Sequence, residues 1–353
     1  MTDIEVREVD VDDDAELRAL YEAIRDGDQA GRGGMPYWSE HEFFASCRIP
    51  MPGLRQSVFA AFDGDRVVGG GIMELPLEDN LDKAEFRVAV PPSERGRGVG
   101  TALEAYAAAI ARREGRPTVL TSARVPPDGR DEHPYRLFAE HRGYRVANVE
   151  LERRLDLPVA EERLTELAEA AAAHHADYRI ETYVDDVPEE LIPSFCELLG
   201  LLAHEAPTGD IEFEPEVVTR QMYDAMGARL REQGRTTFIT LAIDASGQAV
   251  ANTVLAVPAH DPGNVYQWAT LVRPEHRGHR LGLAVKVHNL RAMQAANPDR
   301  RRIWTCNAEV NANMVAINEA LGFTPVELVL EFQRTSELAG SGMAAMPGAM
   351  EGA

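Results

Sequence analysis

The stretch 87-RVAVPPSERGRGVGTAL-103 changes from a strand-like to a helix-like pattern within a few residues. An alternating apolar run ends at two prolines, a glycine-rich loop follows, and a helical pattern begins near Thr101. The first amides of a helix lack partners inside the helix, so together with the helix dipole they form an anion site. Glycines let a phosphate approach the backbone, and Arg95 and Arg97 add guanidinium groups that pair with phosphate. The loop is therefore predicted to hold a pyrophosphate.

A second stretch, 270-TLVRPEHRGHRLGLAV-285, repeats this pattern. Aligning Arg95 with Arg277 brings the prolines and two glycines of each loop together, while Arg280 takes the place of Gly98. Two strand-like runs precede each loop, and a helix, a strand, a glycine–aromatic turn and a last strand follow it. The sequence therefore predicts one α/β plan used twice.

The repeat predicts how the chain divides. We expect an N-terminal domain over residues 1–156, a connecting helix within 157–177, a C-terminal domain over 178–335 and a disordered tail over 336–353. Each domain is expected to hold a mixed, mainly antiparallel sheet flanked by helices, which is an α/β (α+β) fold.

The composition excludes several classes of protein. A formal net charge of -22 argues against nucleic-acid binding and against docking on anionic lipid. No run of apolar residues is long enough for a membrane span, and the acidic start predicts no secretory signal. Three widely spaced cysteines without a CxxC pair suit a reducing compartment and predict no metal site. We therefore expect a cytoplasmic protein, either a monomer or a homodimer.

The loop motif Arg-x-x-Gly-x-Gly after V-x-V-x-P, followed by a helix, a strand and the turns Gly143-Tyr144 and Gly322-Phe323, resembles the GNAT superfamily of acyl-CoA-dependent N-acyltransferases. The resemblance covers both copies. It implies acetyl-CoA as co-substrate and direct transfer of the acetyl group to a primary amine of a small molecule or a peptide.

The resemblance also implies which residues contact the cofactor, because in this superfamily the loop wraps the pyrophosphate and the fourth strand offers backbone to the pantetheine arm. In the first copy these are Val88, Ala89, Val90, Arg95, Gly96, Arg97, Gly98, Val99, Gly100 and Thr101. In the second copy they are Leu271, Val272, Arg277, Gly278, His279, Arg280, Leu281, Gly282, Leu283, Asn307 and Asn311.

Two of the second-copy residues have open interpretations. The side chain of Arg280 either blocks the phosphate or replaces an amide contact with its guanidinium group. Asn311 either touches the cofactor arm, as in relatives, or caps the helix that follows it.

The catalytic residues are less complete than the loop. In relatives a glutamate on the fourth strand deprotonates the amine, which implies Glu85, and Gln267 stands in the corresponding place of the second copy. Glu85 has an alternative place on the solvent face of its strand. The tyrosine that relatives use as the general acid is replaced by Ala139 and Asn318. Tyr135 is the substitute we expect, unless it is only a packing aromatic.

Three functions follow from these features. The intact first loop and Glu85 favour an N-acetyltransferase, whereas the missing tyrosines favour a non-catalytic acyl-CoA-binding or sensor protein. A third hypothesis makes one copy active and the other structural. Aromatic and acidic residues in 31–44 and acidic residues in 201–216 favour a small amine with an apolar body as acceptor, unless these segments are only lid packing and a solvated run of charges.

Overall fold

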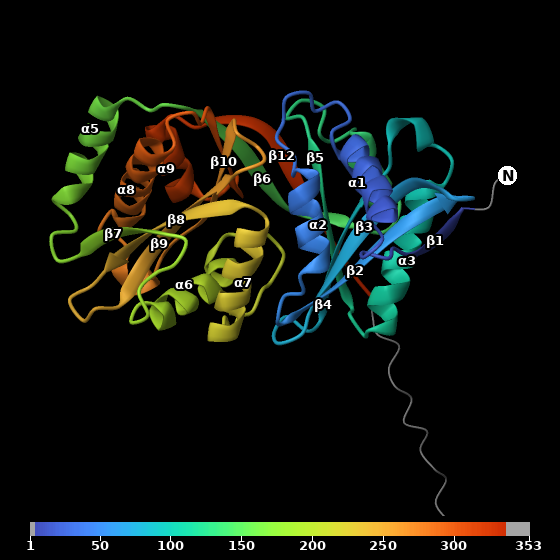
Figure 1. Cartoon of the computed structure of the whole chain (residues 1–353), viewed down its shortest axis with the longest axis horizontal. Helices are drawn as coiled ribbons and strands as arrows, with labels where there is room; N and C mark the ends of the chain where they lie inside the picture. Colours follow the sequence, from blue (N-terminus) through green and yellow to red (C-terminus); the bar gives the residue numbers. More distant parts are fainter. Residues whose placement is uncertain (1–3, 337–353) are drawn as a thin grey trace, which may run out of the picture.

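The apolar alternation of the two copies produces strands of one continuous sheet in the computed structural model, which describes residues 4–336 (Figure 1). The first copy contains β1 (Glu5–Glu8), α1 (Asp14–Asp28), α2 (Glu40–Arg48), β2 (Leu54–Asp63), β3 (Arg66–Pro76), β4 (Lys83–Ala89), the 3-10 turn η1 (Pro92–Glu94), α3 (Val99–Arg113), β5 (Thr118–Val125), α4 (Pro134–Glu140) and β6 (Arg145–Asp156).

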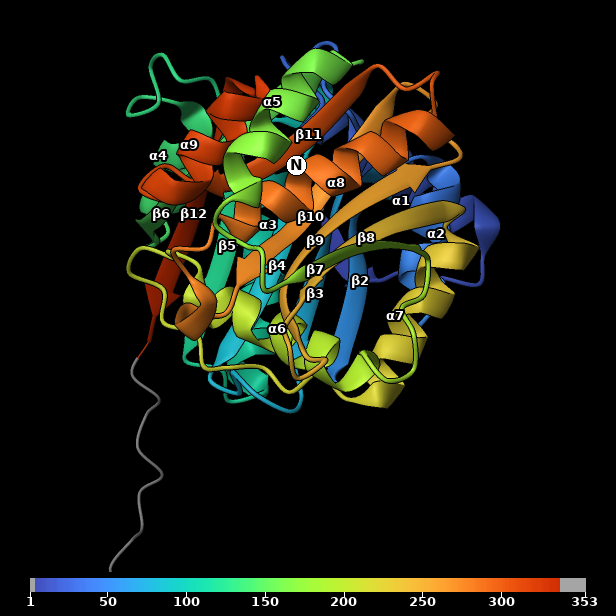
Figure 2. The ribbon, with the colours of Figure 1, turned by 90° about the vertical axis from the view of Figure 1, so that its left-hand side faces the viewer.

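The second copy follows the same plan after α5 (Glu161–Ala172). It contains β7 (Arg179–Val184), α6 (Ile192–Glu205), α7 (Arg220–Glu232), β8 (Arg235–Ile243), β9 (Ala249–Pro258), β10 (Asn264–Val272), η2 (Pro274–His276), α8 (Leu281–Ala296), β11 (Arg302–Ala308), α9 (Ala312–Leu321) and β12 (Thr324–Thr335). The helix α8 packs across β7 to β10 (Figure 2). The mixed, mainly antiparallel sheet with flanking helices is the fold class that the sequence predicts.

The last strands of the two copies are exchanged. The sheet runs β1-β2-β3-β4-β5-β12-β6-β11-β10-β9-β8-β7. The final strand of the chain, β12, therefore pairs with β5 of the first copy, and β6 pairs with β11 of the second copy. The domain division at 156 and 178 remains a proposal from the repeat, because the sheet itself continues across it. The tail proposed for 336–353 lies outside the described residues except for Ser336.

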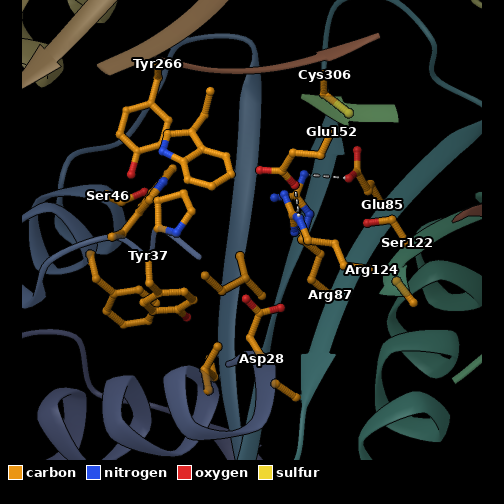
Figure 3. A pocket seen from close by; sticks show the side chains of 18 of the residues that line it. Asp28, Tyr37, Ser46, Glu85, Arg87, Ser122, Arg124, Glu152, Tyr266 and Cys306 are labelled. Carbon is orange, nitrogen blue, oxygen red and sulfur yellow. Dashed lines mark hydrogen bonds and ion pairs between the residues drawn. The ribbon is translucent and has the colours of Figure 1, made fainter. Parts of the chain in front are cut away.

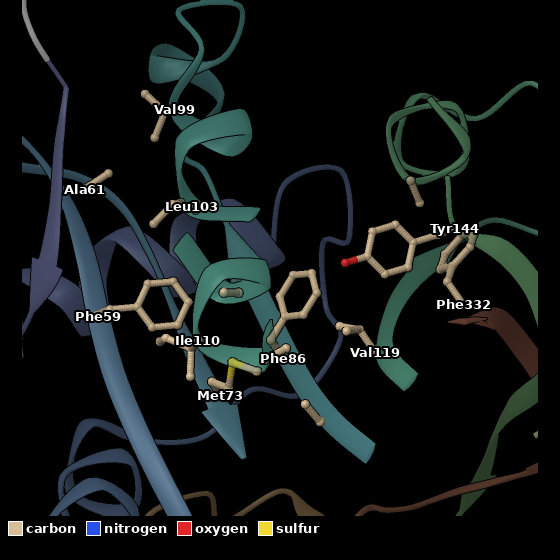
Figure 4. Close-up of a cluster of buried hydrophobic side chains, with 14 of the residues drawn as sticks. Phe59, Ala61, Met73, Phe86, Val99, Leu103, Ile110, Val119, Tyr144 and Phe332 are labelled. Atoms are coloured by element: carbon tan, nitrogen blue, oxygen red, sulfur yellow. The ribbon is translucent and has the colours of Figure 1, made fainter. Parts of the chain in front are cut away.

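The exchange brings side chains of one copy into the core of the other. Phe332 of β12 is 1% exposed and belongs to the first-copy core with Met73 and Leu103 (Figure 4). Leu155 of β6 joins Leu290 in the second-copy core. Each core is therefore completed by a strand from the other half of the sequence.

Helices cover both faces of the first-copy sheet, and small residues on β3 allow their close approach. A Cβ atom built on Gly69 would come within 3.0 Å of Val99 in α3, and one on Gly70 within 2.1 Å of Leu20 in α1. Since successive residues of a strand point to opposite faces, α3 and α1 lie on opposite sides of the sheet.

A buried ion pair joins the two copies. Glu42, in the capping box of α2, accepts a hydrogen bond from Nε of Arg235 at 2.8 Å, and both side chains are at most 2% exposed. Removing either partner would leave the other charge buried without compensation, which would destabilise the contact between the copies.

The strands β4 and β5 separate halfway along their length. They pair in parallel from Lys83–Thr118 to Glu85–Leu120, and no further pair of this ladder is formed by the described residues. The sheet is therefore open between the two strands before the glycine–arginine loop. Among residues 4–336, no helix combines the length and apolarity needed to cross a bilayer.

Candidate functional site

The gap between β4 and β5 opens into a cleft of about 500 Å³. One wall is the end of β4, and the other is β5 with α4; the glycine–arginine loop and the start of α3 close one end. Nearly all the first-copy cofactor residues expected from the resemblance line it, namely Val88, Ala89, Val90, Arg95, Gly96, Gly98, Val99, Gly100 and Thr101. We call this space the loop cleft.

The loop backbone has the conformation of an anion site. Gly96 and Gly98 have φ of +75° and +87°, values that favour glycine. The first amide of α3 to bond inside the helix is that of Ala102, which donates to the Gly98 carbonyl, so the preceding amides of the helix turn are available to a ligand. A Cβ atom on Gly98 would meet nothing within 4 Å. The loop therefore leaves room for a phosphate beside its backbone.

The arginines around the loop have different tasks. Arg95 crosses the cleft and donates to the Tyr135 hydroxyl at 2.9 Å and to the Gly27 carbonyl at 3.0 Å. The side chain of Arg97 forms ion pairs with Asp63 and Glu94, which tie the loop to the neighbouring hairpin. Arg97 therefore offers its backbone, rather than its guanidinium group, to a ligand.

A further cationic group, Arg142, lines the loop cleft and was missed from the sequence. Its guanidinium stacks 3.6 Å from the ring centre of Phe138 and donates to the hydroxyl of Thr101 in the first turn of α3. In the sequence, Arg142 directly precedes the glycine–aromatic turn, and this position next to a recognised motif was the signal that could have identified it.

Tyr135 and Glu85 lie in different places. Tyr135 lines the loop cleft, where its hydroxyl is bonded by Arg95, whereas Glu85 lines a second cavity. The hydroxyl of Tyr135 is thus directed to the phosphate end of the cleft.

The second cavity, of about 420 Å³, lies between the two copies. We call it the central cavity. It shares part of its wall with the loop cleft, including Asp28, Phe86, Ser122 and Arg124. The two spaces therefore meet where β4 and β5 separate.

One side of the central cavity is charged (Figure 3). Glu85 on β4 is 41% exposed and accepts a hydrogen bond from Arg87 at 3.0 Å. Across the gap, Arg124 on β5 donates through Nε to Glu152 of β6 at 3.0 Å. Burial is the main reason that the pKa of Glu152 is raised above its usual value. Glu85 thus faces the cavity rather than bulk solvent alone, and its role as the base remains a proposal.

The other side of the central cavity is aromatic. All three tryptophans of the chain, Trp38, Trp268 and Trp304, line it together with Tyr37 and Tyr266. Trp38 and Trp268 are each 40% exposed, although large apolar side chains are usually buried. The aromatic side comes from both copies, so the cavity exists only when the two copies are assembled.

The residue of the second copy that corresponds to Glu85 is Tyr266, which corrects the sequence alignment with Gln267. In the parallel ladder of β4 and β5, Glu85 pairs with Leu120, the third residue of β5. In the parallel ladder of β10 and β11, Tyr266 pairs with Trp304, the third residue of β11. Between Gln267 and Thr270, β10 has one residue more than its partner strand β9. An alignment of the two copies that starts from the loop is therefore shifted by one position for the residues that precede this bulge. The Gln267 side chain is buried and donates to the Val254 carbonyl at 2.8 Å.

Protein groups engage the arginines of the second loop. Arg277 pairs with Glu205 at 2.7 Å, and Nη1 of Arg280 donates to the Ala170 carbonyl in α5 at 3.0 Å. Arg280 has a left-handed φ of +52° at the start of α8, and its side chain turns towards α5. In this conformation its guanidinium is bound by protein rather than held out for a phosphate.

Larger polar side chains stand in the second copy where the loop cleft lies in the first. Asn318 corresponds to Ala139, since each precedes its turn glycine by four residues, and the ladders match Asn307 with Ala123. Asn318 donates to Asn307 at 2.9 Å. Both alanines line the loop cleft.

The buried Lys286 completes this hydrogen-bonded group. Lys286 corresponds to Glu104, another residue of the loop cleft, and its Nζ donates to Asn318 at 2.7 Å. Burial lowers its pKa to about 7. We call Lys286, Asn307 and Asn318 the polar plug. Asn311 caps α9 by accepting from the Met314 amide at 3.1 Å, which is one of its two expected roles.

The side chains of the remaining second-copy residues contribute differently. Leu271 and Leu281 are buried in hydrophobic clusters, so only their backbone is open to a cofactor role. Nδ1 of His279 lies 3.1 Å from the His174 carbonyl. Among residues 4–336, no group of three or more His, Cys, Asp and Glu side chains has an arrangement that would hold a metal ion.

Comparison with models of known protein families gives a match that includes the strands and the loop of the loop cleft. Residues 17–144, from α1 to the first glycine–aromatic turn, match the model of the acetyltransferase (GNAT) family. The match to the GNAT family model thus lies within the first copy. No curated protein matches the sequence significantly.

Solved structures extend the GNAT fold over both copies. A tandem GNAT protein from the clavulanic acid biosynthesis pathway, solved without acetyl-CoA, is 26% identical with a TM-score of 0.74, and the match covers 94% of this chain and 98% of that chain. A GCN5-related N-acetyltransferase from Sphaerobacter thermophilus is 17% identical with a TM-score of 0.62, covering 94% and 95%. N-myristoyltransferase from Saccharomyces cerevisiae with bound myristoyl-CoA and inhibitors is 11% identical with a TM-score of 0.60, covering 95% and 80%. The last two show the shared fold alone.

Proposed function

We propose that the protein is an acyl-CoA-dependent N-acyltransferase that moves an acetyl group to the primary amine of a small molecule or peptide. The observation that carries this proposal is the meeting of two spaces at the separated strands: an anion-binding loop cleft and a central cavity that contains Glu85. One space fits the acyl donor and the other fits the amine.

The loop cleft fits the donor because its backbone and cations suit a pyrophosphate. The amides between Gly98 and Thr101, with Arg95 and Arg142, would hold the phosphates of acetyl-CoA. The end of β4 remains paired with β3, but its other edge offers backbone groups to the pantetheine arm, since β5 has separated from it. The bound thioester supplies an activated acyl group that an amine can attack.

The central cavity would position and deprotonate the amine. Glu85 accepts a proton from the ammonium group directly or through a water molecule, which makes the amine nucleophilic. Tyr135 is bonded to Arg95 and orients this arginine at the phosphate end, away from Glu85, so its position does not support the general-acid role expected from the sequence. The departing thiolate would take its proton from water. The second copy would contribute the aromatic wall, so one copy carries the donor site and the other completes the acceptor site.

A transfer assay tests the proposal. The protein is mixed with acetyl-CoA and a panel of primary amines, free thiol is measured over time, and the acetylated amine is identified by mass spectrometry. Acetylation of at least one amine supports the enzyme. Acetyl-CoA binding without transfer to any amine would instead support a non-catalytic acyl-CoA sensor.

A further inference from the structure

The charges of the central cavity nearly balance. Its lining carries four carboxylates, from Asp28, Glu74, Glu85 and Glu152, and three guanidiniums, from Arg32, Arg87 and Arg124. A cavity that selects a polyamine would carry a clear excess of acid, and one that selects an anion would carry an excess of base. Near balance suits a ligand that has both charges.

Two of the arginines retain hydrogen-bond donors for a ligand. Within the described part of the chain, the ion pairs of Arg124 to Glu152 and Glu327 both run through Nε, so its two terminal nitrogens remain. Arg87 contacts Glu85 through Nη2 only, and its side chain is 66% exposed. By contrast, Arg32 is held by Asp28 and Glu327 and is 10% exposed. Arg87 and Arg124 are therefore the cations that can bind an added carboxylate.

The position of these arginines places a carboxylate beside the amine. Glu85 and Arg87 are two residues apart on β4, so their side chains share one face, and Arg124 approaches from β5 across the gap (Figure 3). If the ammonium group of a ligand faces Glu85, a second group of that ligand, a few ångströms from the ammonium group, would lie between Arg87 and Arg124. An α-amino acid has its carboxylate at this separation from its amine.

The aromatic side defines the rest of the ligand. Tyr37 and Tyr266 lie across the cavity from the charged side (Figure 3). Trp38 and Trp268, each 40% exposed, gather with Tyr266 around Arg235 and also line the cavity, so this aromatic side would bury an apolar body. We infer that the central cavity binds an α-amino acid with an aromatic or other large apolar side chain, and that Arg124 with Arg87 selects its carboxylate. This inference names the acceptor class of the proposed transferase and therefore rests on that function.

Binding can be measured without catalysis, because all three tryptophans of the chain line this cavity. Tryptophan fluorescence would be titrated with L-phenylalanine, with phenethylamine, which lacks the carboxylate, and with 3-phenylpropanoate, which lacks the amine. Each titration is run with and without CoA. We expect L-phenylalanine to saturate the signal with an affinity at least about tenfold higher than either partial ligand, since each lost charged contact costs about that much.

Substitutions of Arg124 test whether its contact with the carboxylate causes the higher affinity for L-phenylalanine. Arg124→Gln should weaken L-phenylalanine binding about tenfold and leave phenethylamine binding unchanged, and Arg124→Lys should restore part of the loss. Arg113→Gln, an exposed arginine at the end of α3, is the matched control and should change neither.

The inference is overturned if phenethylamine binds as tightly as L-phenylalanine, if none of the three ligands gives a saturable signal, or if Arg124→Gln weakens phenethylamine equally. Acetyl-CoA binding, measured separately by calorimetry, tests the proposed function. A protein that binds L-phenylalanine but not acetyl-CoA would keep the inferred site and lose the transferase.

Discussion

Glu85 is the carboxylate on which the proposed chemistry depends most. It faces the central cavity from the last position at which β4 pairs with β5, directly before these two strands separate. Replacing it by glutamine keeps the shape and the hydrogen bond to Arg87 but removes the proton acceptor. We expect Glu85→Gln to lower turnover about a hundredfold to ten-thousandfold with unchanged affinity for acetyl-CoA, as measured by thiol release and calorimetry.

The matched control for this variant is Glu74→Gln. Glu74 pairs with Glu85 across β3 and β4 and also lines the cavity. A loss of turnover below tenfold is expected for it. Equal losses in the two variants would show that the total charge of the cavity matters and that Glu85 is not the base.

Lys286 predicts a specific pH dependence of stability. Its folded pKa of about 7 lies below the value of an exposed lysine because the side chain is buried. Below pH 7 the folded protein bears the full cost of burying the charge. Above pH 7 the folded protein has released the proton while the unfolded chain still holds it, so stability rises by about 1.4 kcal/mol per pH unit until the unfolded lysine titrates.

Thermal unfolding of Lys286→Met checks this dependence. Between pH 7.5 and 9, the melting temperature of the parent should rise by a few degrees relative to that of the variant. Lys83→Met is the control, because Lys83 is the only other lysine and its charge is compensated by Asp82 at 2.7 Å. A difference between parent and Lys286→Met that stays constant with pH would contradict a neutral buried lysine.

At the scale of elements, the two glycine–arginine loops should behave differently. Gly98→Arg makes the first loop resemble the second and places a side chain in the open space where the phosphate is expected. We expect a loss of acetyl-CoA affinity of about tenfold or more, because charged hydrogen bonds to the loop amides are lost. Calorimetry measures this change directly.

The reciprocal variant, Arg280→Gly, should not create a second site. The polar plug still fills the space that the loop cleft occupies in the first copy, and Arg277 still pairs with Glu205. A second equivalent of bound acetyl-CoA in Arg280→Gly would show that Arg280 alone blocks the second loop.

The sequence predicted those elements whose signals are local. Short runs of adjacent residues mark the glycine–arginine loop, the repeat of the plan and the turn glycines, so these features could be predicted. Tyr266 was missed because the extra residue in β10 has no marker in a strand of ordinary residues. Arg124 and Trp304 belong to the central cavity only through the meeting of distant strands, which no local pattern encodes.

At the scale of the whole molecule, the exchanged strands make the two copies depend on each other. A strand pattern predicts which face is buried but not which strand is its neighbour, so the exchange could not be predicted from the sequence. Expressed alone, residues 1–156 lack β12 and its core side chain Phe332. We expect this fragment to be insoluble or unfolded by circular dichroism.

Co-expression of 1–177 with 178–353 provides the test of this dependence. The two pieces together contain every strand, so they should form a soluble complex that purifies as one species. A fragment 1–156 that folds alone, with a cooperative melting transition, would show that the first copy does not need β12.

We propose that the whole chain binds one acyl-CoA, in the loop cleft of the first copy, beside an acceptor cavity that both copies build. Calorimetric titration of the intact chain with acetyl-CoA measures both the number of sites and their affinity. We expect one equivalent bound per chain in the parent and in Arg280→Gly, with a strong loss of affinity in Gly98→Arg. No binding, two equivalents in the parent, or unchanged affinity in Gly98→Arg would contradict it.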